Sequence, residues 1–303
     1  MTSSNSSMLK LLQLIGRQDW ISFGVRDRII RKICNPDNIG SQEFEVEFFG
    51  SIYKGNLNCY LDWMVYFYGA YEKHELYMLR DILKNKIKPV FIDIGANIGH
   101  HSLYMSGYSE QIHAFEPYEI VSKHLEMKIL HNKIQNIHVH KVGLGKTDCE
   151  LDYYAPKGPN TGTGSFVSSH AVENNEHFGK LKIVNADKQI AELSLDHIDL
   201  IKMDVEGFEK NVLMGMSETL KRFRPILFME YSSDTRNSFA GEKELMSMLP
   251  VDYCVKLVRT NKTFMFIFNK PDSSYEDFNF NATGGNIIFF PMEEARKFGL
   301  MKR

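Results

Sequence analysis

The chain has 303 residues, 43% of them hydrophobic, and a formal net charge of −2. This length allows one large domain or one domain with an extension, and the weak charge argues against nucleic acid or an anionic membrane as a partner held by bulk electrostatics. The 4 cysteines lack a CxxC spacing, no apolar run reaches the roughly 18 residues of a membrane span, and no signal peptide is evident, so we expect a cytoplasmic protein with free thiols.

The N-terminal residues divide into a polar tail and a basic amphipathic segment. Residues 1–7 are expected to be disordered, and Met8 to Ile33 to be helical, although Gly16 and Gly24 interrupt the pattern. The basic charge of the segment allows a weak contact with a membrane surface or a partner protein. The alternative is a helical extension that packs its apolar residues on the core or on a second subunit of a homodimer.

A strand pair and an aromatic segment follow. Glu43 to Tyr53 alternates as a strand with a turn at Gly50, and Asn56 to Tyr71 carries 6 aromatic side chains. Such clusters are usually core, although aromatic walls also bind sugars and flat acceptors. We predict an N-terminal extension over residues 1–68, helical with a short strand pair, and a second domain over residues 69–303.

The stretch from Pro89 to Gly99, PVFIDIGANIG, predicts a buried strand that runs into a glycine turn and opens a helix. Gly95 and Gly99 let the backbone turn sharply and come close to a ligand. The amides and the positive dipole end of the next helix point into the same crevice. Since ligands of open α/β sheets bind at the carboxyl ends of the strands, this turn is the predicted floor of a site.

Two acids at predicted strand ends indicate the ligand. Asp93 stands just before the first glycine, in a turn that is not the GxGxxG of dinucleotide folds, and it would repel a pyrophosphate but attract an ammonium and a sulfonium. Glu116, at the tip of the next strand, suits a ribose diol. Together they favour S-adenosylmethionine. An NAD-dependent oxidoreductase is the alternative, because it also uses an acid in the place of Glu116.

Three motifs in order, FIDIGANIG, HAFEPYE and IKMDVEGFE, resemble those of one known family. From about Gly69 to Pro291 the chain resembles the FkbM family of class I S-adenosylmethionine-dependent methyltransferases. The resemblance implies a Rossmann-like α/β fold, a doubly wound and mostly parallel sheet of seven strands with an antiparallel last strand.

The remaining segments fit the alternation of strands and helices that this fold requires. A loop is expected over residues 156–169, and the last strands are expected to form a hairpin that turns at Thr260 and Asn261. The expected helices cover residues 72–85, 98–107 and 119–132 and the stripe from Phe208 to Leu220, and the expected strands cover 112–116, 137–142, 149–154, 180–186, 197–204, 225–231, 252–258, 262–268 and 286–291.

The resemblance also implies which residues contact the cofactor. In the family a Gly-x-Tyr-Glu element precedes the cofactor motif, and residues 69–72 match it. The strand end at Val142 and Gly143 corresponds to the approach to the adenine ring, and the loop over residues 162–166 to a small-residue loop near the methyl group. The full predicted set is Glu72, Asp93, Gly95, Ala96, Asn97, Gly99, Glu116, Pro117, Val142, Gly143, Ser165 and Asp204.

Methyl transfer to an alcohol also requires a base at the reacting hydroxyl. Glu206 and Glu230, both near predicted strand ends, are the base candidates. Asp204 suits the ammonium of the cofactor or the reacting hydroxyl, and His100 stands where it can shape the preference for the acceptor.

Metal ligation is a weaker interpretation of the same acids. Asp204 and Glu206, with Asp187 and Asp196, offer oxygen ligands suited to magnesium, but they serve equally as cofactor ligands or solvated caps. The pair His138 and His140 alternates on a strand and lacks a third ligand nearby in the sequence. We therefore assign no metal ligand.

These observations predict an O-methyltransferase that uses S-adenosylmethionine and a hydroxyl-bearing acceptor, most simply a sugar, a glycan or a glycosylated small molecule. The sugar rests on the family resemblance and on the aromatic segment. Two alternatives stay open: an NAD-dependent oxidoreductase, and a non-catalytic cofactor-binding scaffold that docks through its basic N-terminal helix.

Overall fold

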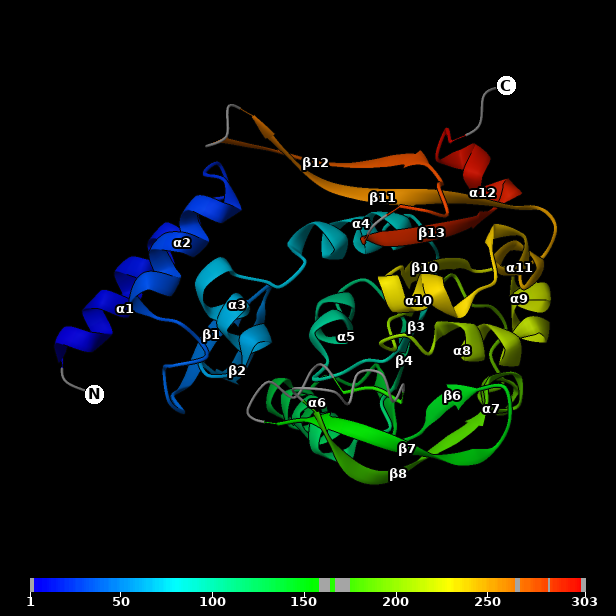
Figure 1. Ribbon diagram of the computed structural model, residues 1–303, viewed down its shortest axis with the longest axis horizontal. Coiled ribbons are helices and arrows are strands. Elements are labelled where there is room, and N and C mark those ends of the chain that lie inside the picture. Colours follow the sequence, from blue (N-terminus) through cyan, green and yellow to red (C-terminus); the bar gives the residue numbers. More distant parts are fainter. Residues whose placement is uncertain (1–2, 158–163, 167–174, 265–267, 283, 301–303) are drawn as a thin grey trace. The chain divides into compact units, whose positions relative to one another are not determined.

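A computed structural model describes residues 3–157, 164–166, 175–264, 268–282 and 284–300 (Figure 1). The described residues form two compact units. The first, which we call the N-terminal unit, consists of the residues up to Met78 and of the segment from Thr260 to Ser273. The second, the sheet unit, contains the other described residues. The predicted domain boundary between residues 68 and 69 stays a prediction.

The N-terminal unit begins with two helices, where the sequence predicted one helical segment after a disordered tail. Helix α1 spans Ser3–Gly16 and α2 spans Phe23–Ile33, so the helix starts within the expected tail and breaks after Gly16. Gly16, the last residue of α1, packs closely on α3, since a Cβ at Gly16 would lie 2.4 Å from the carbonyl oxygen of Phe67. Only glycine therefore allows α1 to approach α3 this closely.

The other elements of this unit are a hairpin and two helices. Strands β1 (Glu43–Phe48) and β2 (Ser51–Asn56) pair antiparallel, which confirms the predicted strand pair. Phe49 and Gly50 form the turn, and both have positive φ, as a tight hairpin turn requires. Helix α3 spans Tyr60–Tyr68, and α4 spans Lys73–Leu83.

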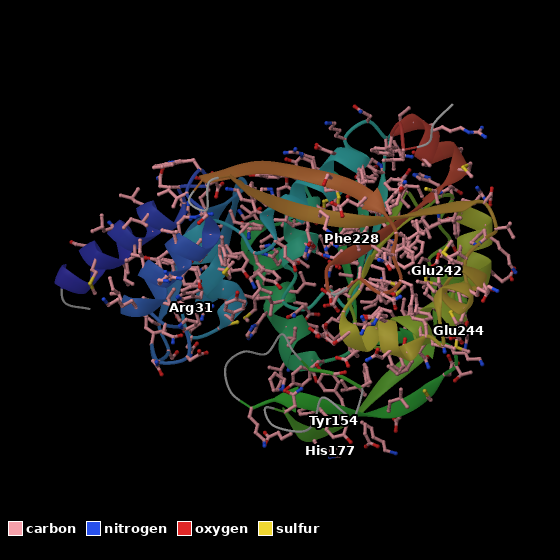
Figure 2. All side chains as sticks on the ribbon, turned by 45° about the horizontal axis from the view of Figure 1, so that its top comes forward. Arg31, Tyr154, His177, Phe228, Glu242 and Glu244 are labelled. Carbon is pink, nitrogen blue, oxygen red and sulfur yellow. The ribbon has the colours of Figure 1, made fainter. Side chains whose placement is uncertain are left out.

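Part of the aromatic segment forms the core of this unit, as predicted. Trp63 and Phe67 are fully buried, and the Trp63 indole Nε1 donates a hydrogen bond to the Cys34 carbonyl, 3.0 Å away. Arg31, labelled in Figure 2, covers the rings of Trp63 and Tyr60, with its Cζ 5.0 and 5.4 Å from their centroids. At least one basic side chain of α2 therefore packs against the aromatic core.

The described strands form an eight-stranded sheet of order β12-β11-β13-β10-β9-β3-β4-β5, which belongs to the sheet unit except for the parts of β11 and β12 between Thr260 and Ser273. The five strands from β10 to β5 are parallel, and β13 pairs antiparallel with both β10 and β11. This order confirms the predicted α/β sheet with an antiparallel strand near its end. The bounds are β3 Val90–Ile94, β4 Gln111–Phe115, β5 Ile137–His140, β9 Leu200–Met203, β10 Ile226–Glu230, β11 Tyr253–Phe264, β12 Phe268–Asp277 and β13 Asn286–Pro291.

Three predictions about strands were wrong in detail. The sheet has eight strands instead of seven, and Thr260 and Asn261 lie within β11, because the strand continues to Phe264. The third parallel strand ends at His140, and Gly143 instead begins β6 of a separate three-stranded sheet of order β6-β8-β7. The strands of this smaller sheet are β6 Gly143–Gly145, β7 Cys149–Pro156 and β8 Asn175–Asn185.

The helices expected over residues 98–107 and 119–132 are present, whereas four further helices of the sheet unit, α7, α10, α11 and α12, were not predicted. The predicted helix after Phe208 divides into α8 and α9, and Gly215, the last residue of α8, packs so closely on β6 that a Cβ there would lie 2.0 Å from the carbonyl oxygen of Gly145. The helices are α5 His100–Met105, α6 Glu119–Asn132, α7 Ala186–Glu192, α8 Glu209–Gly215, α9 Ser217–Phe223, α10 Ser233–Ser238, α11 Glu242–Ser247 and α12 Met292–Lys297.

The parallel strands are buried on both faces. Phe228, in the middle of β10, has about 1% of its surface exposed (Figure 2), and every residue of β3 and β9 is buried. This burial fits strands that helices cover on both sides. Among the described helices, none combines the length and the apolar character that crossing a bilayer requires.

Candidate active site

The carboxyl ends of β3, β4, β9 and β10 meet at one edge of the sheet. The register pairs Ile94 with both Phe115 and Met203, and Met203 with Met229. The residues that follow these strands therefore lie side by side, as the sequence predicted for the site.

The glycine turn after β3 is packed against the turn after β9. Gly95 has φ +78°, and a Cβ there would lie 1.8 Å from the carbonyl oxygen of Asp204. The amides of Gly95 and Ala96 both donate to the Phe115 carbonyl, each over 3.0 Å. Gly99 also has positive φ, and a Cβ there would lie 2.2 Å from Leu125 of α6. The two glycines are thus required by close packing within the protein itself.

A buried chain of charges runs beneath this turn. Asp93 is fully buried, and it accepts a hydrogen bond from the Ser102 hydroxyl over 2.6 Å. The Lys202 ammonium, on the neighbouring strand β9, lies 3.9 Å from Asp93 Oδ1 and 3.1 Å from Asp204 Oδ2. Burial raises the pKa of Asp93, against the lowering effect of Lys202 and Ser102. Lys202 therefore holds two of the predicted site carboxylates in place.

Glu116 receives two backbone amides. Its Oε2 accepts from the Asn97 amide at 3.0 Å, and its Oε1 accepts from the Tyr118 amide at 2.9 Å. Burial raises its pKa to about 7, although these amides and Lys202 lower it. A carboxylate has about four acceptor positions, so each oxygen keeps one lone pair for a ligand.

The turn after β9 is held by an acid that the sequence did not single out. Glu206 and Gly207 both have positive φ, and Glu209 accepts hydrogen bonds from the amides of Val205 (3.0 Å) and Gly207 (3.4 Å). The Thr235 hydroxyl donates to the other Glu209 oxygen at 2.8 Å. An acid in the first turn of a helix, preceded by glycine, is the signal that could have identified this positioning role.

Glu230 ends β10, and one of its carboxyl oxygens has no hydrogen-bond partner among the described residues. That oxygen is buried, and burial raises the pKa of Glu230 to about 10. The negative charges of Asp204, Glu206 and Glu209 raise the pKa further, in that order, and Lys202 lowers it. Glu230 thus faces three other carboxylates across the strand ends.

The structure places Ser165 beside Glu206. The Ser165 hydroxyl donates to the Glu206 carbonyl oxygen at 2.8 Å, and the side chain is buried. Residues 162 and 163 of the predicted small-residue loop lie outside the described residues. The described part of this loop is therefore joined to the turn that carries Glu206.

The predicted adenine-side residues gather near β6. A Cβ at Gly143 would lie 2.5 Å from Ile183 and 3.5 Å from Pro117, so both predicted residues, Gly143 and Pro117, lie together. Val142 packs against the main core of the sheet unit.

Two tyrosines near Glu116 were not predicted. The rings of Tyr118 and Tyr153 lie 5.1 Å apart, and Tyr153 is close enough to Glu116 and Glu206 for both carboxylates to raise its pKa, after the larger effect of burial. Tyr153 comes from β7, whose sequence gave no signal for a site.

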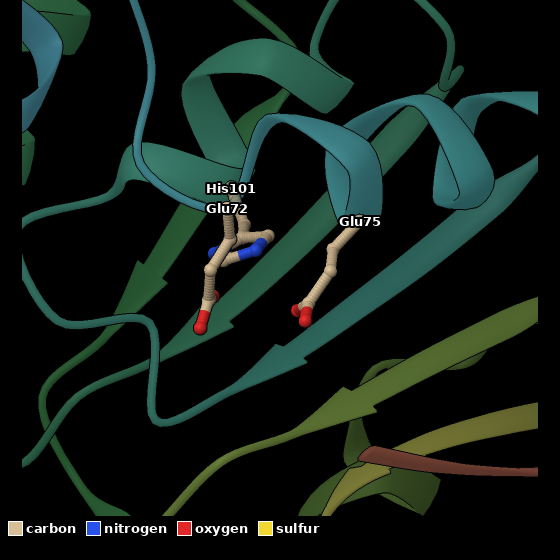
Figure 3. Close-up of side chains that lie close together, drawn as sticks. All are labelled: Glu72, Glu75 and His101. Atoms are coloured by element: carbon tan, nitrogen blue, oxygen red, sulfur yellow. The ribbon is translucent and has the colours of Figure 1, made fainter. Parts of the chain in front are cut away.

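The remaining candidates divide between the two units. His100 is buried in the first turn of α5, and burial lowers the pKa of its neighbour His101 well below the ordinary value, as do the charges of Lys202 and His100. Glu72 belongs to the N-terminal unit, where it precedes α4, and Glu75 lies in the first turn of that helix (Figure 3).

Two of the weaker metal candidates have structural surroundings of their own. Asp187 accepts hydrogen bonds from the amides of Glu218 and Thr219, so it caps the start of α9. His140 Nε2 lies 3.1 Å from His113 Nδ1, so the pair His138 and His140 on β5 has a third histidine, His113, beside it on β4.

A strand order with an antiparallel strand inserted beside the last parallel one, and acids at the strand ends, define a class I methyltransferase fold. A family model described as "Methyltransferase FkbM domain" matches residues 93–255, more than half of the chain. The chain therefore belongs to the FkbM methyltransferase family and carries its methyltransferase domain.

Known proteins match over parts of the chain. The chain is 25% identical to the AMB antimetabolite synthetase AmbE of Pseudomonas aeruginosa. The match covers 53% of this chain but only 9% of AmbE. It is 24% identical to the 2-O-methyltransferase NoeI of Sinorhizobium fredii, over 55% of this chain and 72% of that one. Among solved structures, a methyltransferase FkbM from Methylobacillus flagellatus is 18% identical, with a TM-score of 0.41, over 67% of this chain and 44% of that one.

Proposed function

We propose that the protein transfers a methyl group from S-adenosylmethionine to a hydroxyl of a sugar, a glycan or a glycosylated small molecule. The observation that carries the proposal is the charge imbalance at the strand ends. Asp93, Asp204 and Glu116 gather there, and Lys202, the cation beside Asp93 and Asp204, offsets only part of their charge. Such a site favours a ligand that carries positive charge and no phosphate.

The residues present fit the adenosyl cofactor. Asp204, about one third exposed, can accept the ammonium of its methionine part, and the free lone pairs of Glu116 suit the ribose hydroxyls. A dinucleotide would instead bring its pyrophosphate towards buried Asp93 and the other acids, which supports S-adenosylmethionine over NAD.

The bound cofactor supplies an activated methyl group on its sulfonium, so the protein has to align the acceptor and remove one proton. In the transfer, the bond from carbon to sulfur breaks while the bond from carbon to the acceptor oxygen forms. The hydroxyl proton moves to a carboxylate. Glu230 suits this role better than Glu206, because its raised pKa makes its ionised form the stronger base.

The positive charge of the ligand also prepares Glu230. Without a cationic ligand, burial and then the surrounding carboxylates keep the pKa of Glu230 raised and the side chain protonated at neutral pH, although Lys202 opposes them. A ligand cation opposes that effect and favours the ionised form, which is the form that accepts a proton. The carboxylate is therefore in its proton-accepting form only when the site is loaded.

Similarity to a protein named as a 2-O-methyltransferase supports a hydroxyl acceptor. The test is to incubate the purified full chain with S-adenosylmethionine and a panel of oligosaccharides and methyl glycosides. Mass spectrometry would then detect methylated product and S-adenosylhomocysteine. We expect Glu230→Gln to lose most turnover and to keep cofactor binding. Full turnover in both Glu230→Gln and Glu206→Gln would refute both base assignments, and cofactor binding without turnover on any acceptor would indicate a scaffold.

A further inference from the structure

The N-terminal unit contains a cavity of about 270 Å³, and one residue of its lining, Glu72, also belongs to the predicted cofactor set. Its lining comes from three parts of this unit. These are the connection between α1 and α2 together with the first turns of α2, one side of α3, and the segment that leads into α4. The volume lies near the lower limit of about 300 Å³ for small-molecule sites, so it suits one ring better than a chain of rings.

Aromatic rings form the apolar part of the lining. Tyr60 and Tyr71 meet edge to face, with their centroids 6.2 Å apart, and both remain partly exposed. Phe23 and Tyr68 form a second pair at 5.1 Å. Tyr60 is further held by stacking on Trp63 of the core. These contacts fix the rings in place, so the apolar wall exists before any ligand binds.

Charged groups of both signs form the polar part. Arg26 is 5% exposed, and it donates a hydrogen bond to Asp19 at 3.1 Å. Lys73 forms an ion pair with the same carboxylate. Among the described residues, Nε of Arg26 is buried with no hydrogen-bond partner. The acids Glu72 and Glu75, three residues apart at the start of α4, complete the lining.

This combination selects for a neutral polyhydroxylated ring. A charged ligand would meet a like charge on one side of the cavity, and an apolar ligand would remove water from buried charges without replacing its hydrogen bonds. A sugar hydroxyl both donates and accepts, so it can bond to carboxylates and to a guanidinium in the same cavity. The apolar face of the ring can then pack on the tyrosines.

We infer that this cavity binds a carbohydrate ring, with Tyr60 and Tyr71 as the platform and Arg26, Glu72 and Glu75 as the polar contacts. The inference deepens the proposed function. It rests on that function in one respect only, namely that the bound sugar is part of the methyl acceptor. The binding itself can be measured without any methyl transfer.

The experiment uses the full chain and saturation-transfer difference NMR, followed by titration calorimetry. The probes are the methyl glycosides of glucose, galactose and mannose, with methyl glucuronide as an anion, glucosamine as a cation and p-cresol as an apolar ring. We expect binding of at least one neutral glycoside, and a loss of about 10-fold or more in affinity in Tyr71→Ala and Tyr60→Ala.

Tyr66→Ala is the matched control. Tyr66 lies on α3, as Tyr60 does, and it packs on the same core as Tyr60 and Tyr71 without lining the cavity. It should keep the affinity, and Tyr71→Phe should keep most of it. No binding of any neutral glycoside, binding of charged or apolar probes only, or equal affinity in Tyr71→Ala and Tyr66→Ala would each overturn the inference. Titration of the same preparation with S-adenosylhomocysteine separates the two proposals, because either ligand can bind when the other fails.

Discussion

The strand ends of the sheet unit and the cavity of the N-terminal unit arrange their charges in different ways. At the strand ends, Lys202 faces Asp93 and Asp204, and the carboxylates outnumber it. In the cavity, three carboxylates, Asp19, Glu72 and Glu75, lie with two cations, Arg26 and Lys73, and both cations pair with Asp19. The first arrangement leaves negative charge for a cationic ligand, whereas the second is closer to balance and suits a neutral one.

The largest effect is expected from Gly95→Ala, which tests whether the turn that holds the strand-end charges tolerates any side chain. The added Cβ would lie 1.8 Å from the Asp204 carbonyl, at a residue with positive φ. We expect a loss of roughly 4–5 kcal/mol in the free energy of unfolding, measured by urea denaturation, and no binding of S-adenosylhomocysteine. Gly107→Ala is the control, because its Cβ would make only an ordinary contact at 3.8 Å.

Removing one cation from each region sharpens the comparison. Lys202→Met removes the cation that faces both Asp204 and the buried Asp93. We therefore expect it to lower the free energy of unfolding by about 3 kcal/mol. Lys73→Met should cost less than about 1 kcal/mol, because Lys73 is partly exposed and Asp19 keeps Arg26. Equal losses in the two variants would show that the charges of the two regions are held alike.

Cofactor affinity should depend on the acids of the strand ends alone. Glu116→Ala and Asp204→Ala should each weaken the binding of S-adenosylhomocysteine by roughly 1.5–3 kcal/mol, the range for hydrogen bonds to charged groups. Asp93→Ala should do the same through the turn and through Lys202. Calorimetry would measure the losses, with Asp152→Ala, an exposed acid of β7, as the control. Unchanged affinity in all three variants would remove the site assignment.

The stability of the protein should fall with rising pH on account of Glu230. The unfolded chain releases this proton near the ordinary glutamate value of 4.5, whereas the folded protein holds it up to about pH 10. Between these values the folded state binds more protons, so ionisation costs stability as the pH rises. Glu230→Gln should therefore add roughly 1–3 kcal/mol to the free energy of unfolding at pH 8 and almost nothing near pH 4.5. A variant less stable than wild type at pH 8 would contradict this.

Local patterns predicted which turns meet at the strand ends, because the order of the strands along the chain places them there. The run from Val90 to Gly99 encodes a buried strand, a turn and a helix start within ten residues, and the motif around Asp204 does the same. Parallel pairing then brings these turns together without further information.

Other features depend on contacts between distant residues, so no local pattern announces them. Glu209 has its role because Thr235 and the turn after β9 surround it, and β11 continues past Asn261 although that residue is typical of a turn. Trp63 is buried whereas Tyr60 and Tyr71 are only partly buried, and this difference depends on how α1 and α2 pack on α3. The aromatic segment could therefore be assigned to the core but not to a cavity.

The most direct test of the account is calorimetric titration of the purified chain with S-adenosylhomocysteine, and with NAD under the same conditions. The charge imbalance at the strand ends predicts that S-adenosylhomocysteine binds at micromolar concentration or tighter and that NAD does not bind. Binding of NAD alone would contradict the account, because a dinucleotide would then tolerate Asp93 and its neighbours. Binding of neither would show that the acids at the strand ends do not form an adenosyl site.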